Sequence, residues 1–148
     1  MIIAVDFDGT IVEHEYPRIG REIPFAIDVL KRLQQQEFHQ LILWTVREGE
    51  LLKEAVEYCR ERGLEFYAVN SDFPVDIDID IPVSRKLKVD LFIDDRNLGG
   101  LPDWGVIYRM IKFGETQEEA INSANAEFMH RKKPNFLIRL GQMFESQR

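Results

Sequence analysis

Near its start the chain carries the segment Ile2-Ile3-Ala4-Val5-Asp6-Phe7-Asp8-Gly9-Thr10, which is the strongest indication of its fold. The first four residues of this stretch are apolar β-formers and predict a buried strand, with two aspartates and a glycine at its carboxyl end. Open α/β sheets carry out their chemistry at that edge. Two carboxylates separated by one residue repel each other unless a cation or a reacting phosphate lies between them. We therefore expect a chemical role for Asp6 and Asp8, against the plainer alternative of an acidic β-turn.

Apolar runs and amphipathic segments alternate along the chain after this strand. The further expected strands span residues 41–44, 66–69, 89–93 and 105–108. Helices are expected from near Pro24, around the apolar positions between Leu52 and Cys59, and after Thr116. Thr116 and Glu119 form a capping-box pattern, and the last helix must end before Pro134. Such alternation is typical of a parallel sheet covered on both faces. We expect a single α/β domain over residues 1–148, with its core in about 1–112 and C-terminal helical segments in about 116–148.

The composition limits the class of protein. The 148 residues carry a net charge of −7 and 45% of them are hydrophobic, which suits one globular domain and argues against general binding to nucleic acids or anionic membranes. No stretch reaches the roughly 20 apolar residues of a membrane span, and no signal-peptide pattern begins the chain, so we expect a cytoplasmic protein. Cys59 is the single cysteine, which excludes an intrachain disulfide and a cysteine-based zinc site, and its helical spacing predicts a core position.

Two segments do not fit the alternation. Residues 75–81 alternate apolar side chains with aspartates, which predicts an exposed edge strand or hairpin, with a cation site on the acidic face as the alternative. In the tail from His130, basic residues outnumber acidic ones, and an apolar stripe at helical spacing is formed by Phe136, Leu137, Leu140, Met143 and Phe144. We expect a helix packed on the domain or on a second subunit of a homo-oligomer. A basic patch that recruits an anionic substrate is the alternative.

Polar side chains also follow the second and fourth expected strands. Thr45 comes directly after the run Leu41–Trp44, as a phosphate ligand or as a common strand terminator and helix N-cap. Arg47 could contact a phosphate or substrate, although an exposed arginine in a first helical turn more often has no chemical role. The fourth strand runs into Asp94 and Asp95, a second acidic pair. Two acidic strand ends in adjacent sheet positions predict a magnesium site.

Four elements in chain order resemble motifs I to IV of the haloacid dehalogenase (HAD) superfamily: the first acidic pair, Thr45, the basic run Ser84-Arg85-Lys86-Leu87-Lys88, and Asp94-Asp95. Four such elements, each near the end of its own strand, are harder to obtain by chance than one motif. The resemblance covers about residues 1–112. It implies a Rossmann-like, three-layer α/β/α fold with five parallel strands in the order 5-4-1-2-3, and a Mg²⁺-dependent phosphatase that acts through an aspartyl-phosphate.

The resemblance also implies roles for single residues. Asp6 would attack phosphorus, and Asp8 would protonate the leaving group and then activate the hydrolytic water. Thr45 would bind the phosphate, and Lys86 matches the usual place of the motif III cation, with Lys88 and Arg85 as alternatives and a solvated loop as the plainer reading. Further contacts to the phosphate or substrate are expected from Phe7 and Gly9, at the turn after the first strand, and from Arg47 and Lys88.

The expected metal ligands come from the two acidic pairs. Mg²⁺ prefers few protein carboxylates together with water and phosphate oxygens. Asp6, the carbonyl of Asp8 and one of Asp94 or Asp95 would suffice, and the resemblance favours Asp95 as the direct ligand, with Asp94 orienting it.

The segments where HAD enzymes carry a cap domain are short in this chain. Residues 11–23 can form only a flap and residues 71–85 only a small hairpin or loop, so the chain resembles the capless members. The nearest candidates for reading the leaving group are therefore flap residues, namely Glu13, His14, Tyr16, Arg18 and Arg21. The motif style resembles deoxyribonucleotidase-type and polynucleotide-phosphatase-type branches, which favours nucleotides or other small phosphomonoesters as substrates.

Two rival functions share the same residues. One is a noncatalytic module that keeps a HAD scaffold and binds metal or phosphate, and it would bind without turnover. The other is a phosphotransferase or phosphonatase, which would use the same nucleophile with an acceptor site or a Schiff-base lysine. A kinase is not expected, because the chain has no Gly-x-x-x-x-Gly-Lys-Ser/Thr loop.

Overall fold

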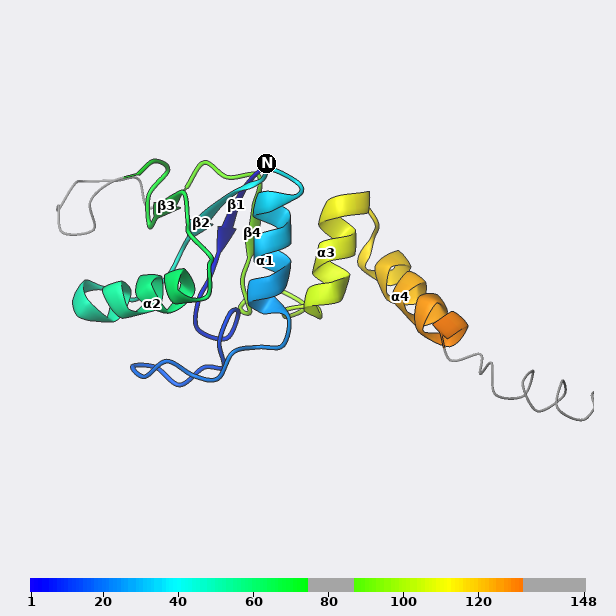
Figure 1. The fold of residues 1–148 in the computed structure, drawn as a ribbon, viewed down its shortest axis with the longest axis horizontal. Helices are drawn as coiled ribbons and strands as arrows, with labels where there is room; N and C mark the ends of the chain where they lie inside the picture. Colours follow the sequence, from blue (N-terminus) through cyan, green and yellow to red (C-terminus); the bar gives the residue numbers. More distant parts are fainter. Residues whose placement is uncertain (75–86, 132–148) are drawn as a thin grey trace, which may run out of the picture.

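The computed structural model describes residues 1–74 and 87–131, which form a parallel sheet and helices (Figure 1). The strands of this part are β1 (Ile2–Val5), β2 (Gln40–Leu43), β3 (Ala68–Val69) and β4 (Leu91–Ile93). The helices are α1 (Ala26–Gln35), α2 (Gly49–Glu61), α3 (Trp104–Phe113) and α4 (Gln117–Arg131). The α/β class with a parallel sheet is therefore confirmed.

The sheet is built around β1, and its strands lie in the order β3-β2-β1-β4. Ile3 is in register with Leu41 of β2 and with Leu91 of β4. Burial removes β1 from water along most of its length, which explains why its sequence is an unbroken apolar run and does not alternate. Because all four strands are parallel, their carboxyl ends lie at one edge of the sheet.

Helices α1, α2 and α3 contribute their apolar sides to one core on one face of the sheet, and α1 and α3 lie side by side (Figure 1). The other face carries a smaller cluster formed by Ala4, Ile42, Ala68 and Leu87. No helix in residues 1–74 and 87–131 contributes to that smaller cluster. The expected helical cover on both faces is thus shown for one face. Helix α4 packs on α3 and extends away from the sheet (Figure 1).

The prediction of a fifth strand at residues 105–108 is wrong, because this segment lies inside α3. The run of Val, Ile and Tyr has strand propensity, but it belongs to a longer segment with apolar residues at helical spacing. Asp103 caps the helix by accepting a hydrogen bond from the Gly105 amide at 2.8 Å. At the other end, Gly114 adopts a φ of 68°, the left-handed conformation that closes helices. Local capping and burial of Trp104 and Ile107 therefore override strand propensity.

Several smaller predictions are settled in the same part of the chain. The third and fourth strands are shorter than predicted, because Phe66, Tyr67, Val89 and Asp90 lie outside β3 and β4. The capping box of α4 is confirmed, since the Thr116 amide donates to the Glu119 carboxylate and the Glu119 amide donates to the Thr116 hydroxyl.

Three further predictions concern the burial of Cys59, membrane-spanning segments, and two segments that lie outside the described residues. Cys59 is buried, and this burial raises the pKa of its thiol to about 12. No helix in the described ranges is long and apolar enough to cross a membrane. The predictions for residues 75–81 and for the stripe at 136–144 lie outside the described residues.

Candidate active site

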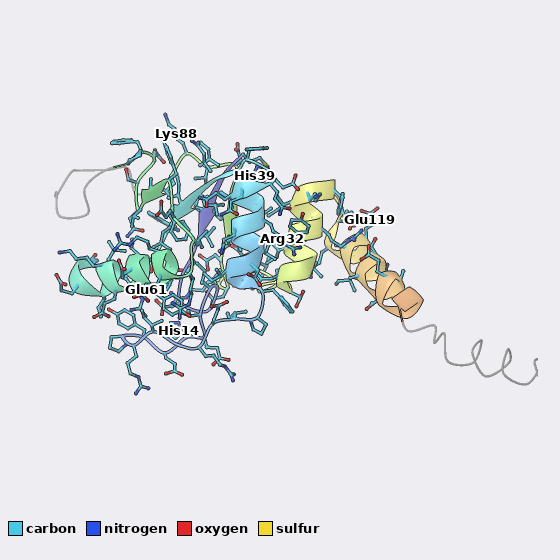
Figure 2. All side chains as sticks on the ribbon, viewed as in Figure 1. His14, Arg32, His39, Glu61, Lys88 and Glu119 are labelled. Atoms are coloured by element: carbon cyan, nitrogen blue, oxygen red, sulfur yellow. The ribbon has the colours of Figure 1, made fainter. Side chains whose placement is uncertain are left out.

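A cleft of about 370 Å³ lies at the carboxyl ends of β1, β2 and β4. Its lining comes from three strand ends and from the flap, here residues 11–23, and consists of Asp6, Asp8, His14, Tyr16, Trp44, Thr45, Val46, Asp94 and Arg96. Figure 2 shows His14 at this end of the molecule and Lys88 at the opposite end. The structure therefore brings the two acidic pairs and the threonine to the same place, as the parallel topology requires.

The backbone after β1 turns sharply at Gly9, which adopts a φ of 93°. The amides of Ile11 and Val12 both donate to the Phe7 carbonyl, and the Gly9 amide donates to the Val12 carbonyl at 2.7 Å. A Cβ atom at Gly9 would lie 2.3 Å from Asp95 Oδ2. Glycine is thus required twice, by its backbone conformation and by the close approach of Asp95.

Three carboxylates from two strand ends meet in the cleft. Asp6, Asp94 and Asp95 each place a carboxylate oxygen within 4.8 Å of the others. The Thr10 hydroxyl joins the two strand ends, because it donates to Asp6 Oδ2 at 3.2 Å and accepts from the Asp95 amide at 3.0 Å. Thr10 is fully buried, and no role had been predicted for it. The sequence shows Thr10 at the end of the first motif, but its two hydrogen-bond partners come together only in the tertiary fold.

The electrostatics of this cluster are unfavourable without a cation. Burial raises the pKa of the Asp6 carboxyl to about 6, and the negative charges of Asp94 and Asp95 add to this effect. Hydrogen bonds from the Phe7 amide and the Thr10 hydroxyl act in the opposite direction. Asp95 Oδ1 is buried, and no residue that the structure describes donates a hydrogen bond to it. An orphaned carboxylate oxygen beside two further carboxylates fits a hard divalent cation such as Mg²⁺.

Asp8 lies on the other side of the first motif and is paired with Arg47. Arg47 Nε donates to Asp8 Oδ2 at 2.7 Å, and Arg47 Nη2 donates to Asp8 Oδ1 at 2.6 Å. Both side chains are buried. The expectation of an exposed Arg47 in a first helical turn is therefore wrong, because Arg47 precedes α2 and points into the protein. Its guanidinium faces Asp8, so the structure does not place it on the cleft as a substrate contact.

Thr45 is held in place at the end of β2 by Asn70, which follows β3. Asn70 Oδ1 accepts from the Thr45 amide at 2.8 Å, and Asn70 Nδ2 donates to the Thr45 carbonyl at 3.0 Å. The Thr45 hydroxyl accepts from the Arg47 amide at 3.2 Å and lines the cleft. Asn70 was missed by sequence reasoning. The available signal was its position directly after a strand, the same signal that identified Thr45.

One isolated β-bridge, between Val12 and Asp8, joins the flap to the turn after β1, and a second, between Val12 and Glu22, pairs the two ends of the flap with each other. Of the five predicted flap candidates, His14 and Tyr16 line the cleft. The other three are in exposed ion pairs within the flap, Arg21 with Glu13 at 2.6 Å and Arg18 with Glu15 at 3.4 Å. Three cleft residues had not been predicted as site residues, namely Trp44, Val46 and Arg96.

The remaining predicted residues are placed as follows. Phe7 is buried in the core and donates its amide to the Asp6 carboxylate. The structure does not bring Lys88 to the cleft, because Lys88 lies ahead of β4, at the amino ends of the strands, where its amide donates to Asp72 at 2.7 Å (Figure 2). Arg85 and Lys86 lie outside the described residues. Of the cationic side chains that the structure describes, Arg96 lines the cleft.

Comparison with known proteins adds one relative. No known protein-family model matches the chain, and no curated protein matches it. Among solved structures, the chain is similar to a conserved protein from Bacteroides thetaiotaomicron, with 68% sequence identity and a TM-score of 0.72. The match covers 80% of this chain and 95% of that protein. The chain therefore belongs to the same family as this conserved Bacteroides protein.

Proposed function

We propose that this protein is a phosphomonoester hydrolase of the HAD type that depends on Mg²⁺ and acts through an aspartyl-phosphate. The observation that carries this proposal is the meeting of Asp6, Asp94 and Asp95 with Asp8 and Thr45 around a single cleft. Carboxylates gathered in this way are costly to a fold unless they bind a cation or react. The strand order β3-β2-β1-β4 supports the proposal, because it matches four consecutive positions, 4-1-2-3, of the implied HAD order 5-4-1-2-3.

In the first step, a carboxylate oxygen of Asp6 attacks phosphorus. The bond from phosphorus to the leaving-group oxygen breaks, and that oxygen takes a proton from Asp8. In the second step, Asp8 removes a proton from water, and the water oxygen attacks phosphorus. The acyl-phosphate bond breaks, so that phosphate leaves and the Asp6 carboxylate is restored.

The metal would be held by Asp6, by the Asp8 carbonyl and by Asp95, whose Oδ1 has no hydrogen-bond donor among the described residues. When bound, Mg²⁺ supplies positive charge to the transferred group and to the carboxylates around it. Asp94 lines the cleft and accepts a hydrogen bond from the Arg96 amide at 2.8 Å, which fixes the turn after β4. Thr45 and Arg96 supply a hydroxyl and a positive charge for phosphate oxygens.

The leaving group would occupy the part of the cleft lined by Tyr16, Trp44 and His14. These rings offer flat, partly apolar surfaces, which suit a nucleoside or another small aromatic group. His14 and Tyr16 of the flap line part of the cleft, and residues 11–23 contain no helix or strand that could form a cap domain. This segment therefore leaves the cleft accessible to small phosphomonoesters.

A second candidate is a noncatalytic module that binds metal or phosphate. It is favoured by the pairing of Asp8 with Arg47, because both oxygens of the proposed acid are engaged in the structure. This candidate predicts Mg²⁺ binding without turnover.

The test is Mg²⁺-dependent phosphate release from a panel of aryl phosphates and nucleoside monophosphates. Asp6→Asn, purified in the same way, controls for contaminating phosphatases. The proposal predicts release by the wild-type protein and none by the variant. Equal release by both proteins would contradict it, and Mg²⁺ binding without release from any substrate would favour the second candidate.

A further inference from the structure

We propose that Arg47 is a positioning residue that couples the flap to Asp8, so that displacement of the flap by a leaving group is transmitted to the proton donor. This inference rests on the proposed phosphatase function for its chemical meaning. The coupling itself rests on contacts within the protein and is measured without turnover.

The hydrogen bonds of Arg47 join two parts of the chain. On one side, its Nε and Nη2 hold both oxygens of Asp8. On the other side, Nη1 donates to the Pro17 carbonyl at 2.9 Å and Nη2 donates to the Arg18 carbonyl at 2.8 Å. Pro17 and Arg18 belong to the flap. One rigid, planar group therefore fixes the distance between the flap backbone and Asp8.

Burial makes this connection obligatory. Arg47 is completely inaccessible to water, and its guanidinium lies 5.1 Å from the centre of the Phe7 ring and 5.4 Å from the centre of the Tyr16 ring. A buried guanidinium that loses an acceptor finds no water to replace it. The flap carbonyls and the Asp8 carboxylate must therefore move together or leave a buried charge without partners.

The flap side of the connection is where a leaving group makes contact. Tyr16 lines the cleft on one face, and the Arg47 guanidinium lies close to its ring. A leaving group that packs against Tyr16 shifts the ring and the adjoining backbone at Pro17, and Arg47 carries that shift to Asp8. Asp8 must reach the leaving oxygen as the bond to phosphorus breaks, so its position controls the step that needs a proton.

The key variant is Arg47→Lys. Lysine keeps a positive charge beside Asp8 but cannot hold two carboxylate oxygens and two flap carbonyls at once. The first readout is hydrogen exchange of amides in residues 13–21. Because the variant loses the two buried hydrogen bonds to the flap carbonyls, amides in this segment should exchange at least about tenfold faster, while the exchange of amides in β1 and β2 stays unchanged. Arg21→Lys, in the exposed flap pair with Glu13, is the matched control and leaves this exchange unchanged.

The second readout is the dependence of turnover on the leaving group. The leaving group of an aryl phosphate with an acidic phenol departs as a phenolate and needs no proton. The leaving group of an alkyl phosphate is a strongly basic alkoxide and needs a proton as it departs. If Arg47→Lys displaces Asp8, the rate of leaving-group release in a single turnover falls about 10- to 100-fold for alkyl phosphates and far less for aryl phosphates. An equal loss for both classes, or no loss, would overturn the positioning role.

Asp8→Asn tests the coupling from the opposite end and serves if Arg47→Lys does not fold. An amide oxygen replaces only one of the two acceptors, so exchange in residues 13–21 accelerates although the flap itself is unchanged. Flap exchange equal to that of the wild-type protein, in either variant, would overturn the coupling. If the wild-type protein releases no leaving group from either class, the proposed function has failed, and the exchange data alone decide whether Arg47 couples the flap to Asp8.

Discussion

Two of the arginine–carboxylate pairs at the flap have the same separation but differ greatly in their exposure to water. Arg47 and Asp8 approach to 2.6 Å, and so do Arg21 and Glu13. The side chains of the first pair are 0% and 5% exposed, whereas those of the second are 80% and 43% exposed. An ion pair that is exposed to water contributes little to the free energy of unfolding. A buried charge that loses its partner destabilises the fold strongly. Environment, and not separation, therefore decides which pair maintains the structure.

The largest expected effect comes from breaking the buried pair. Arg47→Met leaves the Asp8 carboxylate buried without its cation and should lower the free energy of unfolding by about 3–5 kcal/mol in a urea titration at pH 7. The double variant Asp8→Leu with Arg47→Met removes both charges and should recover most of this loss. A loss below about 1 kcal/mol in the single variant would mean that the interior pair behaves like a surface pair.

Glycine substitutions extend the comparison to the backbone. Gly9→Ala forces a Cβ to within 2.3 Å of Asp95 Oδ2 at a φ of 93° and should cost about 2–4 kcal/mol of stability. It should also displace Asp95 and weaken Mg²⁺ binding at least about tenfold by calorimetry.

Gly49→Ala is the matched control for this prediction. Gly49 also has a positive φ, 53°, but nothing lies within 4 Å of the added Cβ. It should therefore cost only about 1 kcal/mol of backbone strain and leave Mg²⁺ binding intact. Equal losses at Gly9 and Gly49 would show that the close approach of Asp95 is unimportant.

A smaller effect is expected from the pKa of Asp6, which is about 6 in the folded, metal-free protein against 3.8 as its ordinary value. Because the folded pKa is raised, ionisation of Asp6 opposes folding above pH 6, and this penalty disappears as the pH falls through 6 toward 4. Asp6→Asn should therefore raise metal-free stability by about 1 kcal/mol at pH 7.5, and by much less at pH 4. A difference that grows toward pH 4 would have the wrong sign.

The smallest effect should come from the exposed pair. Arg21→Met removes the partner of Glu13 in water and should change the free energy of unfolding by about 0.2–1 kcal/mol, less at 1 M salt than at 0.05 M. A loss as large as that of Arg47→Met would remove the contrast between the two pairs.

Local patterns predicted the strand ends well, because an apolar run followed by a polar residue identifies both the strand and the place where it ends. Asp6, Thr45 and Asp94 were found in this way, and the structure brings them to one cleft. The burial of Arg47 was not predictable locally, since its partner Asp8 is 39 positions away. The helix at residues 104–113 was missed because three residues with strand propensity, Val106, Ile107 and Tyr108, were interpreted without the caps on either side.

The proposed nucleophilic role of Asp6 is best tested by measuring the covalent state of this residue during turnover. The protein would be mixed with an aryl phosphate and Mg²⁺, quenched in acid within one turnover, and its peptides examined by mass spectrometry. An aspartyl-phosphate intermediate predicts the mass of one phosphoryl group on the peptide that contains Asp6, absent in Asp6→Asn and removed by hydroxylamine. Phosphate release that occurs without this modification and is undiminished in Asp6→Asn would show that Asp6 is not the nucleophile.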